Sequence, residues 1–192
     1  MMNKSLMLPR AKFYSDMGLS VILMDLRARG ASTGRRTGGM GEGNIPDVEA
    51  VVNYYMSHYK KYGKLIGYGF SHGGRAIIHT AASHSHFERL ILESTPYSLA
   101  DGMYRQFKLP ERPKFEEENI DGALASMPKM PILLIIGDND TAIIPKEGNE
   151  LLKHSKSKKS QIVIFPKTAH DVVIDQNKEK VISTIKAFLD LK

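Results

Sequence analysis

The 192-residue chain contains no cysteine. This absence excludes disulfide bonds, thiolate metal sites and cysteine nucleophiles, so any covalent chemistry depends on another side chain. The chain also lacks an apolar run long enough to cross a membrane. Its first residues, MMNKSLMLPR, lack the long apolar stretch and the small-residue cleavage site of a signal peptide. We therefore expect a cytoplasmic protein with no stable membrane insertion.

The composition is that of an ordinary folded protein. The chain has 42% hydrophobic residues, 25% charged residues and only 9 prolines, and its length suits a single domain with a sizeable core. The net charge of +6 is scattered along the sequence. The one dense basic run, residues 153–160, lies between a predicted helix and a predicted strand, which favours a solvated loop over an anion-binding patch. We expect no nucleic-acid partner.

Five apolar or β-branched runs predict the strands of a sheet. The runs are continuous rather than alternating, which is typical of strands buried on both faces. They lie at residues 20–25, 64–69, 89–94, 131–137 and 161–166. Segments with helical spacing lie between and around them, at residues 9–17, 45–59, 74–83, 145–153 and 177–191. This alternation predicts an α/β fold, with a mostly parallel sheet of about five strands and helices on both faces.

Residues 95–130 carry neither pattern and are too numerous to be a mere connection. Within them, Tyr97, Met103, Tyr104 and Phe107 could form an apolar cover over a binding site, and we interpret the segment as a lid-like insertion. The alternative is a helix packed on the sheet edge without a substrate role. An apolar cover would favour acyl groups over charged peptides.

The sequence GFSHG, Gly69 to Gly73, is a G-x-S-x-G motif at the junction of a predicted strand and a predicted helix. A sharp turn there strains the central residue and leaves no room for side chains two positions before and after it, which predicts glycine at both places. The turn would expose the Ser71 hydroxyl and aim the first free helical N–H groups, that of His72 first, at an oxyanion. The alternative is a glycine-rich turn with an incidental serine.

A serine hydroxyl is a poor nucleophile near neutral pH, so this hypothesis needs a base and an orienting carboxylate. Asp138 and Asp140 follow the fourth predicted strand, and His170 follows the fifth. The order serine, acid, histidine is that of hydrolases with this turn. The residues alone do not decide which of the two aspartates is the orienting carboxylate. The remaining histidines are interpreted as surface or helix-packing residues, apart from the one beside the serine: His58, His79, His84, His86 and His154.

Together these motifs resemble the α/β-hydrolase fold superfamily, in particular the compact serine hydrolases that include esterases, acylglycerol lipases and serine aminopeptidase-like members. The resemblance runs from about Ser5 to the C-terminus. It includes GDNDTAIIP, FPKTAHDVV and a D-x-R-G-x-G-x-S pattern, in which alanine replaces one usual glycine at position 28. The resemblance implies a Ser71–Asp140–His170 triad that forms an acyl-serine intermediate, with neither metal nor cofactor. The residues that match the D-x-R-G-x-G-x-S pattern are Asp25, Arg27, Gly30 and Ser32.

One part of the family pattern is absent. Members begin with further strands, one of which ends in a His-Gly loop that supplies a second oxyanion donor. In their sheet this strand lies between those that resemble residues 20–25 and 64–69. These two segments must therefore pair directly or leave backbone groups unpaired. We expect an N-terminally truncated chain whose exposed sheet edges permit self-association.

Two classes of function follow. The first is a serine hydrolase that cleaves a carboxylic ester, or alternatively an amide or thioester, with a small acyl compound as its substrate. The second is a hydrolase-fold protein without efficient catalysis, acting as a binding or scaffold module, because losing one oxyanion donor costs about 10²- to 10³-fold in rate. The complete triad favours the first class.

Overall fold

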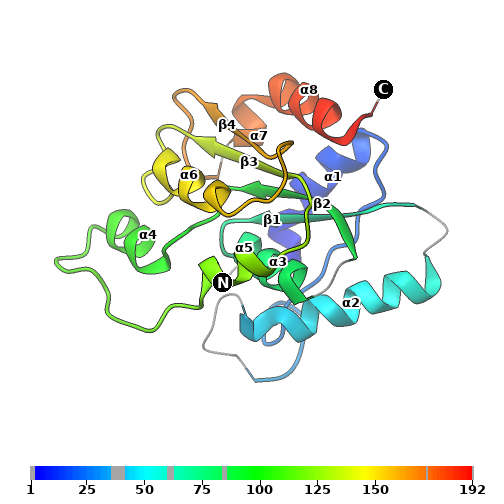
Figure 1. The fold of residues 1–192 in the computed structure, drawn as a ribbon, viewed down its shortest axis with the longest axis horizontal. Coiled ribbons are helices and arrows are strands. Elements are labelled where there is room, and N and C mark those ends of the chain that lie inside the picture. Colours follow the sequence, from blue (N-terminus) through cyan, green and yellow to red (C-terminus); the bar gives the residue numbers. More distant parts are fainter. Residues whose placement is uncertain (1–2, 36–41, 60–62, 84–85, 172, 192) are drawn as a thin grey trace.

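The computed structural model describes residues 3–35, 42–59, 63–83, 86–171 and 173–191, so the expectation for His84 falls outside it. Four parallel strands form one sheet in the order β1-β2-β3-β4 (Figure 1). The predicted α/β class is confirmed, with four strands where about five were expected. The strands are β1 (Leu65–Phe70), β2 (Phe87–Glu93), β3 (Ile132–Gly137) and β4 (Gln161–Phe165).

Helices cover both faces of this sheet (Figure 1). Side chains from α2, α3 and α5 belong to one hydrophobic cluster, and side chains from α1, α7 and α8 belong to the other. In the described part of the chain no helix is long and apolar enough to span a membrane. The helices are α1 (Leu8–Asp16), α2 (Ile45–His58), α3 (His72–Ser83), α4 (Leu99–Gln106), α5 (Ile120–Ser126), α6 (Pro145–Lys153), α7 (Val173–Gln176) and α8 (Lys178–Leu189), with 3-10 turns η1 (Lys4–Met7) and η2 (Glu42–Asn44).

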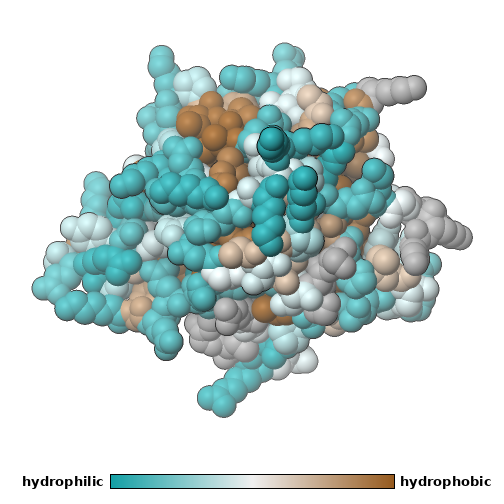
Figure 2. All heavy atoms as spheres, viewed as in Figure 1, coloured by the Kyte–Doolittle hydropathy of each residue, from teal (hydrophilic) through white to brown (hydrophobic). Residues whose placement is uncertain are grey.

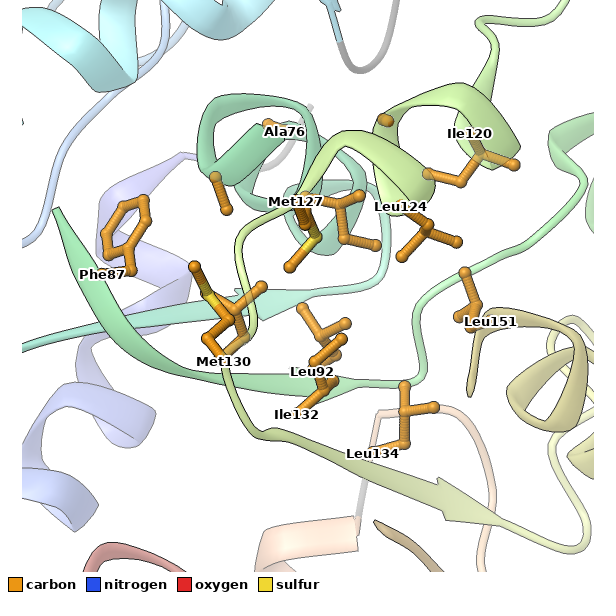
Figure 3. Packing of buried hydrophobic residues seen from close by; sticks show 14 of the residues in the cluster. Ala76, Phe87, Leu92, Ile120, Leu124, Met127, Met130, Ile132, Leu134 and Leu151 are labelled. Atoms are coloured by element: carbon orange, nitrogen blue, oxygen red, sulfur yellow. The ribbon is translucent and has the colours of Figure 1, made fainter. Parts of the chain in front are cut away.

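Strand β3 shows why the predicted strands read as continuous apolar runs. Ile132 and Leu134 belong to the first cluster, whereas Leu133 and Ile135 belong to the second. Figure 3 shows Ile132 and Leu134 on the side of the sheet that carries Leu124 of α5. Burial of each such side chain contributes about 1.5–3 kcal/mol, so both faces of β3 stabilise the fold.

The strand predicted at residues 20–25 is not formed, and this expectation was wrong. Met24 packs against the first cluster, but Val21 and Ile22 are 39% and 48% exposed. Among the described residues, β1 pairs only with β2, so these two segments do not close up on each other. An apolar run predicts burial of side chains, but it does not provide a neighbouring strand for the backbone hydrogen bonds.

The insertion, residues 95–130, contains α4 and α5, which its sequence pattern did not locate. It is fastened to the helix that follows the serine. Arg75 of α3 is fully buried and donates hydrogen bonds to the carbonyl oxygens of Tyr97 at 2.6 Å and Glu118 at 3.1 Å. The guanidinium of Arg75 therefore links α3 to the main chain of the insertion at two points.

Candidate active site

Ser71 lies in a tight turn between β1, which ends at Phe70, and α3, which begins at His72. Its φ of 51° falls in the left-handed region, which is uncommon for residues other than glycine. The Ser71 N–H donates to the carbonyl of Glu93 at the end of β2, at 2.8 Å. The strained turn predicted from the G-x-S-x-G motif is therefore present.

The glycines on either side of this turn differ in what they do. A Cβ at Gly69 would lie 2.4 Å from the Gly74 Cα, so the predicted lack of room is confirmed there. A Cβ at Gly73 would meet no heavy atom within 4 Å, so the same prediction was wrong for Gly73. A side chain at position 73 would therefore extend into open space.

Asp140 and Asp138 both follow β3, and the structure separates them. Asp140 is 2% exposed, and its Oδ1 accepts the N–H groups of Ala142 at 2.9 Å and Ile143 at 2.8 Å. Asp138 is exposed. The buried, hydrogen-bonded carboxylate is the one assigned by the family resemblance.

His170 lies between Asp140 and Ser71. Its Nδ1 donates to Asp140 Oδ2 at 2.7 Å, and its Nε2 accepts from Ser71 Oγ at 3.1 Å. The carboxylate can only accept, which places the ring proton on Nδ1 and leaves the Nε2 lone pair facing the serine hydroxyl. The loop that carries His170 approaches β3 closely, since a Cβ at Gly137 would lie 2.0 Å from the Thr168 carbonyl oxygen.

His72 occupies the first position of α3, where backbone N–H groups have no acceptor within the helix. Its side chain is half-buried, and burial, with the nearby charges of Arg75 and Arg29, lowers its pKa from 6.5 to about 4. The imidazole is therefore neutral at neutral pH. A neutral ring adds no charge of its own beside the Ser71 hydroxyl.

The sequence profile of the prolyl oligopeptidase family matches residues 5–192. The chain belongs to the prolyl oligopeptidase family. This family member is similar to the solved structure of the Pyrococcus furiosus esterase Pf2001, with a TM-score of 0.82 and 26% identity, covering 96% of this chain and 75% of the esterase. It also resembles a Paleococcus ferrophilus monoacylglycerol lipase, with a TM-score of 0.69 and 15% identity, covering 97% of this chain and 90% of the lipase, a likeness that shows the fold alone.

A further relative of this prolyl oligopeptidase family member is protein Bem46 of Schizosaccharomyces pombe. The two are 29% identical over 171 residues, which make up 85% of this chain and 56% of Bem46. The chain thus spans a little over half the length of that relative. Family and fold together place the chain among the proteins of the α/β-hydrolase fold.

In this family member, the insertion lies against the turn that carries Asp140. Arg105 of α4 donates from Nε and Nη2 to the Ala142 carbonyl, at 3.1 and 2.8 Å. A Cβ at Gly102 of α4 would stand in ordinary contact with Ile143, at 3.4 Å. Helix α4 therefore packs on the acid turn.

The four apolar residues predicted to cover the site are placed differently from one another. The Tyr97 hydroxyl donates to Asp121 at 2.8 Å, which engages it within the insertion. Met103 is half-buried, whereas Tyr104 and Phe107 are 42% and 61% exposed. Only part of the predicted cover is therefore packed against the protein.

Two residues at the site escaped the sequence interpretation. Arg10 of α1 forms a bidentate ion pair with Glu93, the last residue of β2, with N–O distances of 3.0 and 2.8 Å. A charged residue at the end of the apolar run RLILE was a visible sign of a buried partner.

Across the described ranges, no group of three His, Asp or Glu side chains is arranged to hold a metal ion.

Proposed function

We propose that the chain hydrolyses carboxylic esters, with Ser71 as the nucleophile, His170 as the general base and Asp140 as the orienting carboxylate. The observation that supports this best is the continuous relay of hydrogen bonds from Asp140 Oδ2 through both ring nitrogens of His170 to Ser71 Oγ. A base that is itself oriented by a third group is what activates a serine near neutral pH.

In the first half of the reaction, Nε2 of His170 takes the Ser71 hydroxyl proton while Oγ attacks the ester carbonyl carbon. The Asp140 carboxylate stabilises the imidazolium that forms. The oxyanion of the tetrahedral intermediate accepts a hydrogen bond from the His72 backbone N–H. Collapse of this intermediate breaks the bond to the alcohol oxygen, which receives the proton from His170. The acyl group then remains on Ser71.

In the second half, His170 removes a proton from a water molecule that attacks the acyl carbonyl carbon. The same N–H stabilises the second oxyanion. Its collapse breaks the bond to Ser71 Oγ, and His170 returns the proton to that oxygen. The carboxylic acid leaves and Ser71 is regenerated.

We favour an ester over an amide or thioester on two grounds. The solved structure with 26% identity and a TM-score of 0.82 is that of an esterase. The insertion, residues 95–130, also packs α4 on the turn that carries Asp140, and an apolar wall formed by α4 would suit an acyl chain better than a charged peptide. We assign the substrate-facing role in this insertion to Tyr97, Met103, Tyr104 and Phe107.

Labelling by a fluorophosphonate tests the proposed nucleophile without requiring its substrate. We expect the wild-type chain to be labelled and Ser71→Ala to remain unlabelled. Asp140→Asn should slow labelling by about 10³- to 10⁴-fold, because the amide no longer fixes the His170 tautomer. The matched control is Asp138→Asn, whose exposed side chain should leave labelling unchanged. Equal labelling of wild type and Ser71→Ala would contradict the proposed function.

The substrate class is tested with nitrophenyl esters of increasing acyl length and with a prolyl nitroanilide. We expect Ser71-dependent turnover of the esters and little of the anilide. Met103→Ala should raise KM for longer acyl esters more than for the acetate, whereas Phe115→Ala, in the loop between α4 and α5, should not. Preferred cleavage of the anilide would reassign the substrate to a peptide.

A further inference from the structure

Arg10 and Glu93 form a charge pair in the interior next to the candidate site. The Glu93 side chain is 1% exposed and the Arg10 side chain is 14% exposed. The hydroxyl of Tyr68 also donates to the Glu93 carboxylate. Burial and the neighbouring Glu93 charge raise the pKa of Tyr68, which keeps this donor protonated. A pair this deeply buried carries a desolvation cost, so its contribution must be sought in what it holds in place.

The pair contacts the nucleophile and the residue before it. The Glu93 main-chain carbonyl accepts the Ser71 N–H at 2.8 Å. The Arg10 guanidinium lies over the ring of Phe70, the residue before Ser71, at 4.1 Å from the ring centroid. The backbone of the serine and the side chain before it are thus held by the two partners of one ion pair.

The guanidinium of Arg10 also reaches the loop that carries His170. Arg10 Nη2 donates to the main-chain carbonyl of Asp171 at 3.1 Å, one residue after His170. The rings of Phe70 and His170 lie 5.2 Å apart between their centroids. Arg10 therefore contacts a residue adjacent to the nucleophile, a residue adjacent to the base and the strand end that anchors Ser71.

We infer that Arg10 is a positioning residue, which sets the distance and orientation of His170 relative to Ser71 by bridging Glu93, Phe70 and the Asp171 carbonyl. This inference rests on the proposed function. The planar guanidinium of Arg10 donates two hydrogen bonds to one carboxylate and a further one to a carbonyl in a fixed geometry, which the point charge of a lysine ammonium does not reproduce. Without the bridge, the 3.1 Å approach of Nε2 to Oγ loses its support, and small misplacements of a base are costly in rate.

The experiment compares Arg10→Met with Arg89→Met. Arg89 is a close match, because it is 15% exposed, bonds a carboxylate and a main-chain carbonyl, and lies over Phe188, but it does so at the opposite end of β2. We expect Arg10→Met to lower kcat and the fluorophosphonate labelling rate about 10- to 100-fold, with KM changed less than about twofold. Arg10→Lys should recover part of this loss, and Arg89→Met should show none of it.

Removing Arg10 alone leaves the Glu93 carboxylate buried without its partner, so Arg10→Met combined with Glu93→Gln provides a second variant that strands no charge. We expect this double variant to fold and to have a lowered kcat as well. Wild-type kcat in the double variant would overturn the inference, as would a change confined to KM.

A readout independent of catalysis separates this inference from the proposed function. Amide hydrogen exchange at residues 168–171 should be faster in Arg10→Met than in the wild type and in Arg89→Met. A wild-type chain that resists fluorophosphonate labelling would overturn the proposed function, and the exchange rates would still decide whether Arg10 holds the loop. Unchanged exchange there would overturn the positioning role.

Discussion

Among single residues, His72 links the stability of the fold to pH. Its pKa of about 4 in the folded chain lies below its ordinary value of 6.5, and burial is the largest cause of this shift. Between these pH values the unfolded chain carries a proton on His72 that the folded chain does not, so the free energy of unfolding falls as the pH falls.

We expect His72 to contribute a loss of about 2 kcal/mol in unfolding free energy between pH 7.5 and pH 5. Denaturant titration of wild type and His72→Gln at both pH values measures it, because the glutamine cannot take up the proton. The two proteins should converge in stability as the pH falls. A stability difference that stays constant from pH 7.5 to pH 5 would show that the ring titrates alike in both states.

The roles of single residues could be predicted only in part. The order of Ser71, Asp140 and His170 along the chain was enough to propose their meeting, because each follows a strand of a parallel sheet at its carboxyl end. The ion pair between Arg10 and Glu93 could not be predicted from the order of motifs along the chain. Its partners are 83 residues apart, and neither lies in a motif that specifies the other.

At the scale of elements, the turn between β1 and α3 makes different demands on its two glycines. Alanine at position 69 would force its Cβ into the Gly74 backbone, which cannot retreat as a flexible side chain could. We expect Gly69→Ala to lower the free energy of unfolding by about 3 kcal/mol. Gly73→Ala meets open space within α3 and should be neutral or stabilising by up to about 1 kcal/mol.

Thermal or urea unfolding of the two alanine variants measures this contrast, with activity left aside because both positions border the candidate oxyanion site. Equal destabilisation would mean that helix α3 begins differently from the turn described here. A stable Gly69→Ala would mean that β1 and α3 can separate at their junction.

The same scale shows where sequence patterns succeed and fail. Strand β3 could be predicted because Ile132 to Ile135 point alternately into two hydrophobic clusters, which leaves no polar position in the run. Residues 20–25 carry a similar run but form no strand. The difference lies in the neighbours, since β3 has a partner on each side and residues 20–25 have no paired strand in the described part of the chain.

At the scale of the whole molecule, the sheet ends in two edges, β1 and β4. Figure 2 shows a largely hydrophilic surface on the side viewed, with a hydrophobic patch near β4, where Ile164 is 41% exposed. Val21 and Ile22, in the segment expected from the sequence to lie beside β1, are also exposed. Open edges next to exposed apolar side chains are sites at which sheets recruit further strands.

We therefore predict concentration-dependent self-association through the β1 side of the molecule, with a second copy of the chain as the partner. A lysine on such a surface opposes edge pairing because its charge would be buried in the contact. Ile22→Lys should raise the dissociation constant at least about tenfold, equivalent to about 1.4 kcal/mol, as measured by sedimentation equilibrium. The matched control is Tyr54→Lys, which adds the same charge at a 57% exposed position on α2, outside the sheet. If both substitutions weaken association equally, net charge rather than the β1 side governs it, and if Ile164→Lys alone dissociates the chain, the contact runs through β4.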